Sequence, residues 1–162
     1  MAYKIIPLEE KNVEEVLKLY NDIIKEGVYF QRKTPFTREG FVDYIGTHHV
    51  YTLMDEDEVA GFFILRPNGG ERIAHIANGT YGLKKDYRGK NLGRYLVSTS
   101  LEKAKEKGFL GIQYNSVVVT NVGARHLYES LGFQEMARIP KGFRTDDGFL
   151  DMSIYFKSLQ GQ

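Results

Sequence analysis

The amino-acid sequence predicts an α/β fold of the α+β type, with a central mixed β-sheet and helices on both faces. Three observations lead to this prediction. With 162 residues, 42% of them hydrophobic and 27% charged, the chain has the size and composition of a globular domain with one core. Stretches of strand length alternate with stretches of helical periodicity. Residues 59–65 are apolar without a break, which is typical of a central strand with both faces covered.

The first half of the chain is predicted to contain a strand, two helices and a hairpin. Apolar residues at three-four spacing between positions 13 and 24 indicate an amphipathic helix, and Gly27 is placed to end it. Thr37 is placed to cap the second helix. The predicted elements, in order, are strand 3–8, helix 9–26, helix 37–46, strand 49–54 and strand 59–66.

The middle of the chain predicts a strand, a basic turn and a helix. Residues 73–83 are mostly apolar, and the pair Asn78-Gly79 interrupts them, which indicates a strand with a local bulge. A helical pattern follows over residues 92–107, and Gly108 supplies its stop.

The turn between this strand and helix can bind an anion. Its backbone N–H groups and the positive end of the helix dipole point to one spot, which suits a phosphate or pyrophosphate. Glycines allow close approach to the backbone, and three basic side chains add charge. Neither a Walker loop nor the dinucleotide fingerprint is present, and on these residues alone a plain connection stays an alternative. The turn reads Arg88-Gly89-Lys90-Asn91-Leu92-Gly93, followed by Arg94.

The last third of the chain predicts a strand, a helix and two terminal strands. Residues 111–119 form the first strand, and Asn121 caps the helix that Gly132 stops. Strands 133–139 and 150–156 then flank a loop. No repeat or linker appears, so we predict one domain over residues 1–162.

The charge balance and the absence of cysteine narrow the function classes. A formal net charge of +1 gives no support for nucleic-acid or membrane binding. Without cysteine there are no disulfides, thiolate metal sites or cysteine nucleophiles. The pair His48-His49 has no second cluster at ligand spacing, so no metal is expected. No apolar signal core or run of transmembrane length is present, which makes the cytoplasm the expected location.

Two stretches resemble the GCN5-related N-acetyltransferase (GNAT) superfamily. The turn at residues 88–93 is similar to the family's acetyl-CoA pyrophosphate loop, Gln/Arg-x-x-Gly-x-Gly/Ala. Residues 121–133 match the family pattern Asn-x-x-Ala-x-x-Leu-Tyr-x-x-x-Gly-Phe at every fixed position. Asn91 departs from the loop, where glycine is usual, but asparagine tolerates left-handed backbone better than most residues.

The resemblance implies a GNAT fold and acetyl-CoA as the acetyl donor. Two central parallel strands, residues 73–83 and 111–119, would diverge and hold the pantetheine arm between them like an added strand. Loop amides would bind the pyrophosphate, and Asn121 would reach the coenzyme arm while capping its helix. The cofactor-binding residues implied in this way are Tyr81, Leu83, Arg88, Gly89, Lys90, Asn91, Leu92, Gly93, Arg94 and Asn121.

The resemblance also implies the catalytic residues. Tyr128 stands where the family has the general acid that protonates the departing thiolate, although its position also fits an aromatic on a buried helix face. His75 lies in the region where many members carry a base, and an imidazole suits that work. A half-buried strand histidine and a water chain to solvent are the alternatives. Because the amine attacks the thioester directly, no covalent enzyme intermediate is needed.

The acceptor is expected to be the primary amine of a small molecule. The loop at residues 28–36 corresponds to a substrate-binding region in the family, so Tyr29, Phe30 and Arg32 are candidate pocket residues, with Asn78 as a further hydrogen-bonding group or merely a bulge residue. Acetylation of a peptide or protein amine, and a non-catalytic acyl-CoA-binding domain, are the alternatives. Relatives are often dimers, and the edges of the two terminal strands can pair between subunits, so a homodimer is among the expected states.

Overall fold

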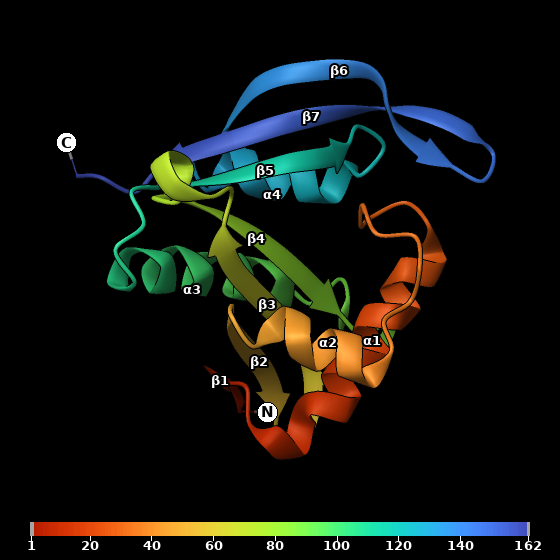
Figure 1. Cartoon of the computed structure of the whole chain (residues 1–162), viewed down its shortest axis with the longest axis vertical. Coiled ribbons are helices and arrows are strands. Elements are labelled where there is room, and N and C mark those ends of the chain that lie inside the picture. The colour runs from red at the N-terminus through yellow and green to blue at the C-terminus, as the bar shows by residue number, and fades with distance from the viewer. Residues whose placement is uncertain (1, 162) are drawn as a thin grey trace.

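The computed structural model describes residues 2–161 and shows, over that range, a seven-stranded mixed sheet with helices on both faces (Figure 1). The predicted order of strands and helices is confirmed, and the first and last residues of the predicted domain lie outside the described range. The strands are β1 (Tyr3–Pro7), β2 (His49–Asp55), β3 (Glu58–Pro67), β4 (Ile76–Leu83), β5 (Gly111–Val118), β6 (Gln134–Thr145) and β7 (Gly148–Ser158). The helices are α1 (Val13–Glu26), α2 (Arg38–Ile45), α3 (Leu92–Glu106) and α4 (Val122–Ser130).

The sheet has one place where its strands separate. The strand order is β1-β2-β3-β4-β5-β7-β6, and β4–β5 is the parallel pair among the described strands. These two strands pair only from Ile76 opposite Gly111 to Asn78 opposite Gln113. Beyond that point β4 stays paired with β3 and β5 stays paired with β7, so the two strands diverge (Figure 1). The predicted divergence of the two parallel strands is therefore present.

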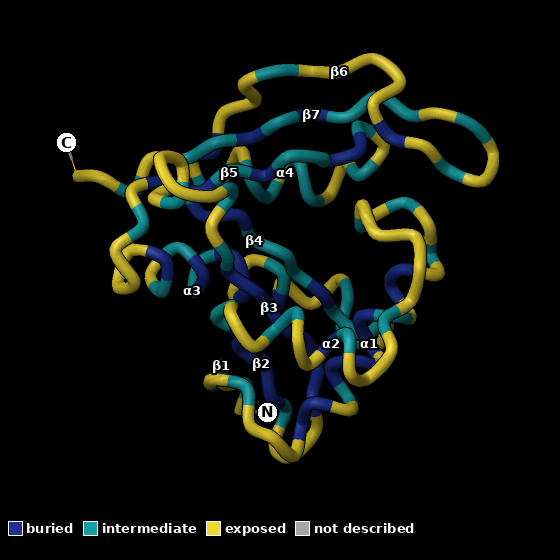
Figure 2. The backbone as a smooth tube through the Cα atoms, in the orientation of Figure 1, coloured by how far each residue is buried: buried dark blue, intermediate teal, exposed yellow. Residues whose placement is uncertain are grey.

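Each face of the sheet carries its own apolar core. Alternate residues of β3 point to opposite faces, so Phe62 and Ile64 pack under α1 and α2, whereas Phe63 and Leu65 pack under α3. All four side chains are fully buried. The buried residues concentrate in β2, β3 and the inner face of α1, while β6 lies mostly exposed at the sheet edge (Figure 2). This burial on both faces explains the continuous apolar run of β3.

The helix boundaries follow the predicted capping residues. Gly27 adopts the left-handed conformation at φ 77° and ends α1, where its N–H donates to the Ile24 carbonyl. The Thr37 side chain accepts a hydrogen bond from the Gly40 N–H at the start of α2. The Asn121 side chain accepts from the Ala124 N–H at the start of α4, at 3.3 Å. Local backbone chemistry therefore sets these ends.

The prediction of a strand over residues 73–83 is wrong about where the strand starts and about the bulge within it. Residues Glu71–Ile73 form a single 3-10 turn, and the strand begins at Ile76. The pairing of β4 with β3 continues through Asn78 and Gly79 without a register shift. Gly79 has another reason to be glycine, because a Cβ there would lie 2.6 Å from the Tyr81 hydroxyl.

The predicted loop between the terminal strands is also wrong. β6 runs to Thr145 and β7 starts at Gly148, so the two strands extend through most of residues 140–148. A register shift between Ile139 and Phe143 interrupts their pairing, and this irregularity explains why no regular alternation is visible there. The long hairpin reaches toward the segment between α1 and α2 (Figure 1).

Candidate active site

The divergence of β4 and β5 opens a cavity of about 910 Å³. Main-chain groups of alternate strand residues point to opposite edges of a strand. The His75 carbonyl accepts from the Leu110 N–H on the β5 side, whereas the Lys84 N–H donates to the Ala60 carbonyl on the β3 side. The main-chain groups of Gly79, Tyr81 and Leu83 therefore point into the cavity. An extended chain placed between the strands would find hydrogen-bonding groups there.

One end of the cavity is formed by the turn before α3, and we call residues 88–94 the loop end. Gly89 has φ +76°, and Asn91 is left-handed with φ 64° and ψ 14°. Asn91 precedes α3 without making a side-chain cap, so the first N–H groups of the helix are free to bind an anion. The lining residues contributed by this turn are Arg88, Gly89, Asn91, Gly93 and Arg94.

The basic side chains of the loop end are engaged in different ways. Arg88 donates two hydrogen bonds of 2.8 Å to the carboxylate of Glu26 and one from Nε to the Leu83 carbonyl at 3.2 Å. This bidentate pair joins the turn to the C-terminal end of α1. Arg94 donates to the Ser130 hydroxyl at 2.8 Å. Lys90 is exposed outside the lining, and the side chain of Leu92 is buried in the core below the turn.

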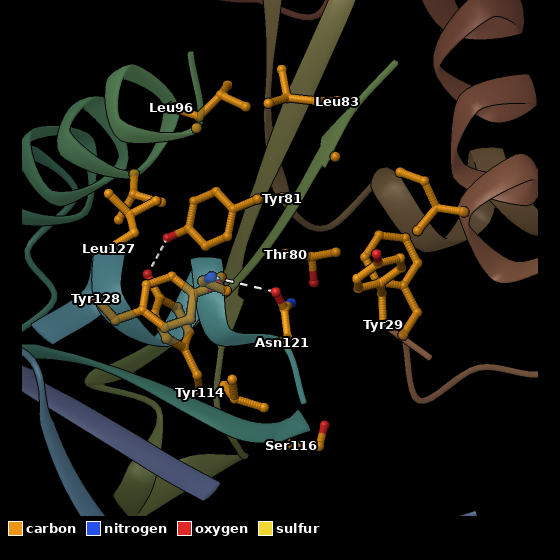
Figure 3. A pocket seen from close by; sticks show the side chains of 18 of the residues that line it. Tyr29, Thr80, Tyr81, Leu83, Leu96, Tyr114, Ser116, Asn121, Leu127 and Tyr128 are labelled. Atoms are coloured by element: carbon orange, nitrogen blue, oxygen red, sulfur yellow. Dashed lines mark hydrogen bonds between the residues drawn. The ribbon is translucent and has the colours of Figure 1, made fainter. Parts of the chain in front are cut away.

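A tyrosine cluster lies where the two strands separate. The hydroxyl of Tyr81 is hydrogen-bonded to the hydroxyl of Tyr114 (Figure 3). It is also hydrogen-bonded to the hydroxyl of Ser100. The rings of Tyr114 and Tyr128 lie 4.5 Å apart between centroids. Burial raises the pKa of Tyr81 to about 12 and that of Tyr114 well above the usual value. All these phenols therefore hold their protons at neutral pH.

Tyr128 differs from its neighbours in having a free hydroxyl. It projects from α4 into the cavity, and its hydroxyl makes no hydrogen bond to any residue in the range 2–161. Burial raises its pKa above the usual value, and the nearby Tyr81 and Tyr155 add to the shift. Its ring packs on Tyr114 and Phe133, so the residue is also part of the core. This agrees with the alternative prediction of an aromatic residue on a buried helix face. A neutral, unpaired phenol in a cavity can donate a proton.

The other end of the cavity is largely aromatic, and we call it the aromatic end. The segment between α1 and α2 supplies Tyr29, Phe30 and Arg32, so the three predicted pocket residues of this loop come together there. In Figure 3, Tyr29 lies across the cavity from Tyr128, with Thr80 and Asn121 between them. Further lining residues at this end are Tyr20, Gln31, Phe36, Tyr44, Arg66, Asn78, Thr80, Asn115 and Ser116.

Amide side chains connect the strands at the point of divergence. The Asn78 side chain donates to Asn68 at 3.2 Å, and Asn115 donates to the same oxygen at 2.8 Å. Gln113 in turn donates to Asn115 at 2.9 Å. Asn78 is 6% exposed and lines the aromatic end. This position agrees with the prediction of a hydrogen-bonding group and disagrees with the prediction of a bulge residue.

Two contacts hold the α1–α2 segment near other parts of the fold. Gln31 donates to the Ser116 hydroxyl at 2.8 Å and so joins the α1–α2 segment to β5. Lys33 lies 3.8 Å from Asp146 at the tip of the β6–β7 hairpin. Both contacts join segments far apart in the sequence, and the exposed Lys33–Asp146 pair is the weaker of the two.

The predicted base does not lie in the cavity. His75 is exposed and precedes β4, at the end where that strand is still next to β5, so it is separated from the cavity by the paired part of the two strands. This position makes it unsuitable as a base for this site. None of the described residues that line the cavity is aspartate, glutamate or histidine.

Several cavity residues are missing from the sequence-based prediction. Tyr20 and Tyr44 have the periodicity of core residues, and Ser116 lies in a register shift of β5 that no local pattern reveals. Arg66 had a visible signal, because it is a cation that ends an otherwise apolar buried strand. A cation at the end of a buried strand needs a hydrogen-bond acceptor, either from the protein or from a ligand.

Residues 2–161 contain neither a metal-binding cluster nor a membrane-spanning helix. No group of three or more histidine or acidic side chains there is close enough to hold a metal ion. No helix among residues 2–161 has the length and apolar character needed to cross a membrane.

Comparison with protein families gives one match over most of the chain. The profile of the acetyltransferase (GNAT) family matches residues 14–133. That range contains both diverging strands, the loop end and Tyr128.

Two curated relatives match part of the chain. Protein SPT10 of Saccharomyces cerevisiae is 34% identical over 86 residues, which cover 53% of this chain and 13% of SPT10. N-acetyltransferase aca1 of Schizosaccharomyces pombe is 33% identical over 105 residues, which cover 62% of this chain and 50% of aca1. The chain spans half or less of the length of these relatives.

Solved structures share the whole fold at low sequence identity. The putative acetyltransferase yncA of Salmonella typhimurium, solved with its cofactor acetyl-CoA, has a TM-score of 0.93 and 15% identity. The match covers 100% of this chain and 96% of yncA.

Proposed function

This chain belongs to the acetyltransferase (GNAT) family, and from that premise we propose that it moves an acetyl group from acetyl-CoA to the primary amine of a small molecule. The family match and the shared fold confirm the predicted family, fold class and acetyl donor. The observation that supports the reaction best is the cavity between β4 and β5, which has an anion-binding turn at one end and a free phenol inside.

The residues present fit acetyl-CoA. The outward-facing main-chain groups of Tyr81 and Leu83 offer donors to an extended pantetheine arm, with one N–H available to polarise the thioester carbonyl. The left-handed Gly89 and Asn91 hold the turn open for the pyrophosphate, and the first amides of α3 donate to it. Bound acetyl-CoA supplies the activated acetyl group.

Tyr128 is the proposed general acid. The acceptor nitrogen forms a bond to the acetyl carbon, the carbon–sulfur bond breaks, and Tyr128 gives its proton to the departing sulfur. Its raised pKa keeps the proton in place before the reaction. The free hydroxyl is the feature that favours this role over a purely structural one.

The absence of acidic and histidine side chains from the cavity lining favours proton loss to water. We propose that the acceptor reacts as the neutral amine, that its nitrogen loses a proton to water as the amide forms, and that Tyr128 regains a proton from water, without a base from the lining residues. The rate at limiting acceptor should then rise with pH up to the pKa of the acceptor's own amine. Since burial keeps Tyr128 protonated, no loss of rate is expected up to about pH 10.

The contact across the aromatic end favours a small acceptor over a folded protein. Gln31 and Ser116 both line the cavity, and their hydrogen bond joins the α1–α2 segment to β5, so this end is narrowed between two segments. A flexible peptide amine remains the alternative acceptor, and a non-catalytic acyl-CoA-binding domain the alternative function.

The test is coenzyme A release from acetyl-CoA with a panel of amines, amino acids and short peptides. Tyr128→Phe should lower kcat about 100-fold or more and leave the Kd of acetyl-CoA unchanged, because only proton donation is lost. Tyr95→Phe, on the exposed face of α3, is the matched control and should behave as the wild type.

The outcomes separate the three candidate functions. Turnover of free amines with Tyr128→Phe impaired supports the proposal. Turnover of peptides alone would replace the small-molecule acceptor by a peptide. Tight acetyl-CoA binding without turnover of any acceptor would favour the non-catalytic domain.

A further inference from the structure

We propose that the acceptor carries an oxyanion, a carboxylate or phosphonate, which binds to Arg66 at the aromatic end of the cavity. The inference rests on the proposed function, because it takes this end as the place where the acceptor binds. It adds the chemical class of the acceptor and a residue that selects it.

Arg66 is a half-buried cation without a partner. It is the second-to-last residue of β3 and lines the cavity. Its Nε is buried and has no hydrogen-bond partner. Within residues 2–161, its guanidinium forms no hydrogen bond or ion pair. A buried N–H of a charged group costs free energy when it has no partner, so a ligand that accepts from this Nε would stabilise the protein.

The surroundings of Arg66 add positive charge and supply no negative charge. Burial raises the pKa of Tyr20, and the charges of Arg66 and Arg32 both oppose this shift, so both guanidiniums lie near the same phenol. Burial lowers the pKa of the neighbouring His48, and Arg66 lowers it further, so this imidazole is neutral at pH 7. No described cavity-lining residue is a carboxylate.

The other arginines of the cavity are accounted for. Arg88 is held by the carboxylate of Glu26, and Arg94 lies at the loop end beside Ser130. Arg32 is exposed, stacks on the Phe36 ring at 3.6 Å and donates from Nε to the Thr34 carbonyl. Arg66 is therefore the unpaired arginine of the cavity lining, and it can bind a second anion, distinct from the pyrophosphate.

The sheet register directs Arg66 toward the acceptor. Arg66 is opposite Asn78, and Ile64 is opposite Thr80, so these pairs share the sheet face under α1 and α2. Asn78 is three residues before Tyr81, or about 10 Å along the strand. If the amine of the acceptor lies at Tyr81, its anionic group can therefore lie near Arg66. Asn78 and Thr80 would then contact the atoms of the acceptor between the amine and the anionic group.

An oxyanion is the ligand that this chemistry recognises. The guanidinium offers up to five donors in a planar fork that matches a carboxylate or a phosphonate. A neutral acceptor would leave the Arg66 charge and its buried Nε unpaired, and a cationic one would add a like charge next to it. An amine that lacks an anion should therefore be the poorer acceptor.

The test measures binding of acetylated products to the full chain in the presence of coenzyme A, by calorimetry. The carboxylate probes are N-acetylglycine, N-acetylalanine and N-acetylphenylalanine, each paired with its neutral amide. The phosphonate probe is N-acetyl-2-aminoethylphosphonate, paired with neutral N-acetylethanolamine. We expect the anionic member to bind more tightly in at least one pair, and the pair that shows this identifies carboxylate or phosphonate.

Variants assign the preference to Arg66. Arg66→Gln should weaken the anionic member about 10- to 100-fold and leave its neutral partner unchanged. Arg66→Lys, which keeps charge but not the fork, should be intermediate. Arg72→Gln is the matched control, because Arg72 is exposed outside the cavity lining and its loss changes net charge equally. Arg66→Gln should also keep or raise Tm, since no native interaction is lost.

Three results would overturn the inference. They are the absence of an anionic preference in every pair, an equal loss in both members of a pair with Arg66→Gln, and an equal loss with Arg72→Gln. Because this readout requires no turnover, it is independent of the proposed reaction. Anion binding through Arg66 in a chain that never releases coenzyme A would overturn the reaction and support the inference.

Discussion

The two ends of the cavity are built in different ways. The loop end comes from seven consecutive residues and the start of one helix. The aromatic end gathers residues from α1, the α1–α2 segment, α2, β3, β4 and β5. A local turn can therefore specify one ligand site, whereas the other exists only because distant segments become neighbours.

This difference has a functional meaning. A site made from consecutive residues can be kept while the rest of the sequence changes, which suits a donor that all family members share. A site assembled from many segments changes with any of them, which suits an acceptor that differs between proteins. The 15% identity to yncA at a TM-score of 0.93 agrees with a shared fold around divergent surfaces.

The sharpest test of the loop end as a local unit is Gly89→Val. Gly89 has φ +76°, and nothing lies within 4 Å of where its Cβ would be, so the effect is conformational. A left-handed non-glycine residue costs about 1–2 kcal/mol, so acetyl-CoA should bind about tenfold more weakly, with acceptor binding unchanged.

Gly108→Val is the matched control. Gly108 has φ +89° and equally open space, but it follows α3 outside the cavity lining. It should lose stability without losing acetyl-CoA affinity. Equal weakening of acetyl-CoA binding by both variants, measured by calorimetry, would contradict a local donor site.

The Arg88–Glu26 pair tests how far the loop end depends on the rest of the fold. The hydrogen bond from Arg88 holds the pKa of Glu26 below its usual value of 4.5, although burial opposes this shift. A lowered pKa stabilises the fold above pH 4.5, and the contribution is lost as pH falls through the folded-state value. Glu26→Gln should therefore cost about 1 kcal/mol at pH 7 and much less below pH 4.

Urea unfolding across pH 3–7 measures this difference. Glu106→Gln, which removes an exposed carboxylate beside Lys103, is the control and should show little pH-dependent effect. Acetyl-CoA affinity that stays at the wild-type level in Glu26→Gln would mean that the turn holds its shape alone. A fewfold loss of acetyl-CoA affinity would instead mean that the turn needs its contact with α1 to keep its shape.

The smallest expected effect is at Asn91. Its backbone is left-handed, at φ 64°. Asparagine adopts this conformation at a modest cost in free energy, and glycine adopts it without strain. Asn91→Gly should tighten acetyl-CoA binding about twofold, and Asn91→Ala should weaken it a fewfold. Changes of the same sign in both variants would show that the asparagine side chain, not its backbone, acts on the coenzyme.

Much of the fold was predictable because its signals are local. Gly27, Thr37 and Asn121 mark helix ends through hydrogen bonds within a few residues, and these positions agree with the structure. The errors occur where a local pattern has a distant cause. Gly79 is small because Tyr81 leans over it, and the β6–β7 pairing continues through a segment with the composition of a loop.

The sequence alone determined the order of the elements, the turn at residues 88–94 and the position of Tyr128, because each follows from periodicity, capping or a short motif. Only the tertiary structure decided that Arg88 is held by Glu26, that His75 lies outside the cavity and that Arg66 has no partner inside it. These facts depend on which distant segments become neighbours in the folded chain. The partners of a side chain are therefore set by the tertiary structure and not by the residues next to it in the sequence.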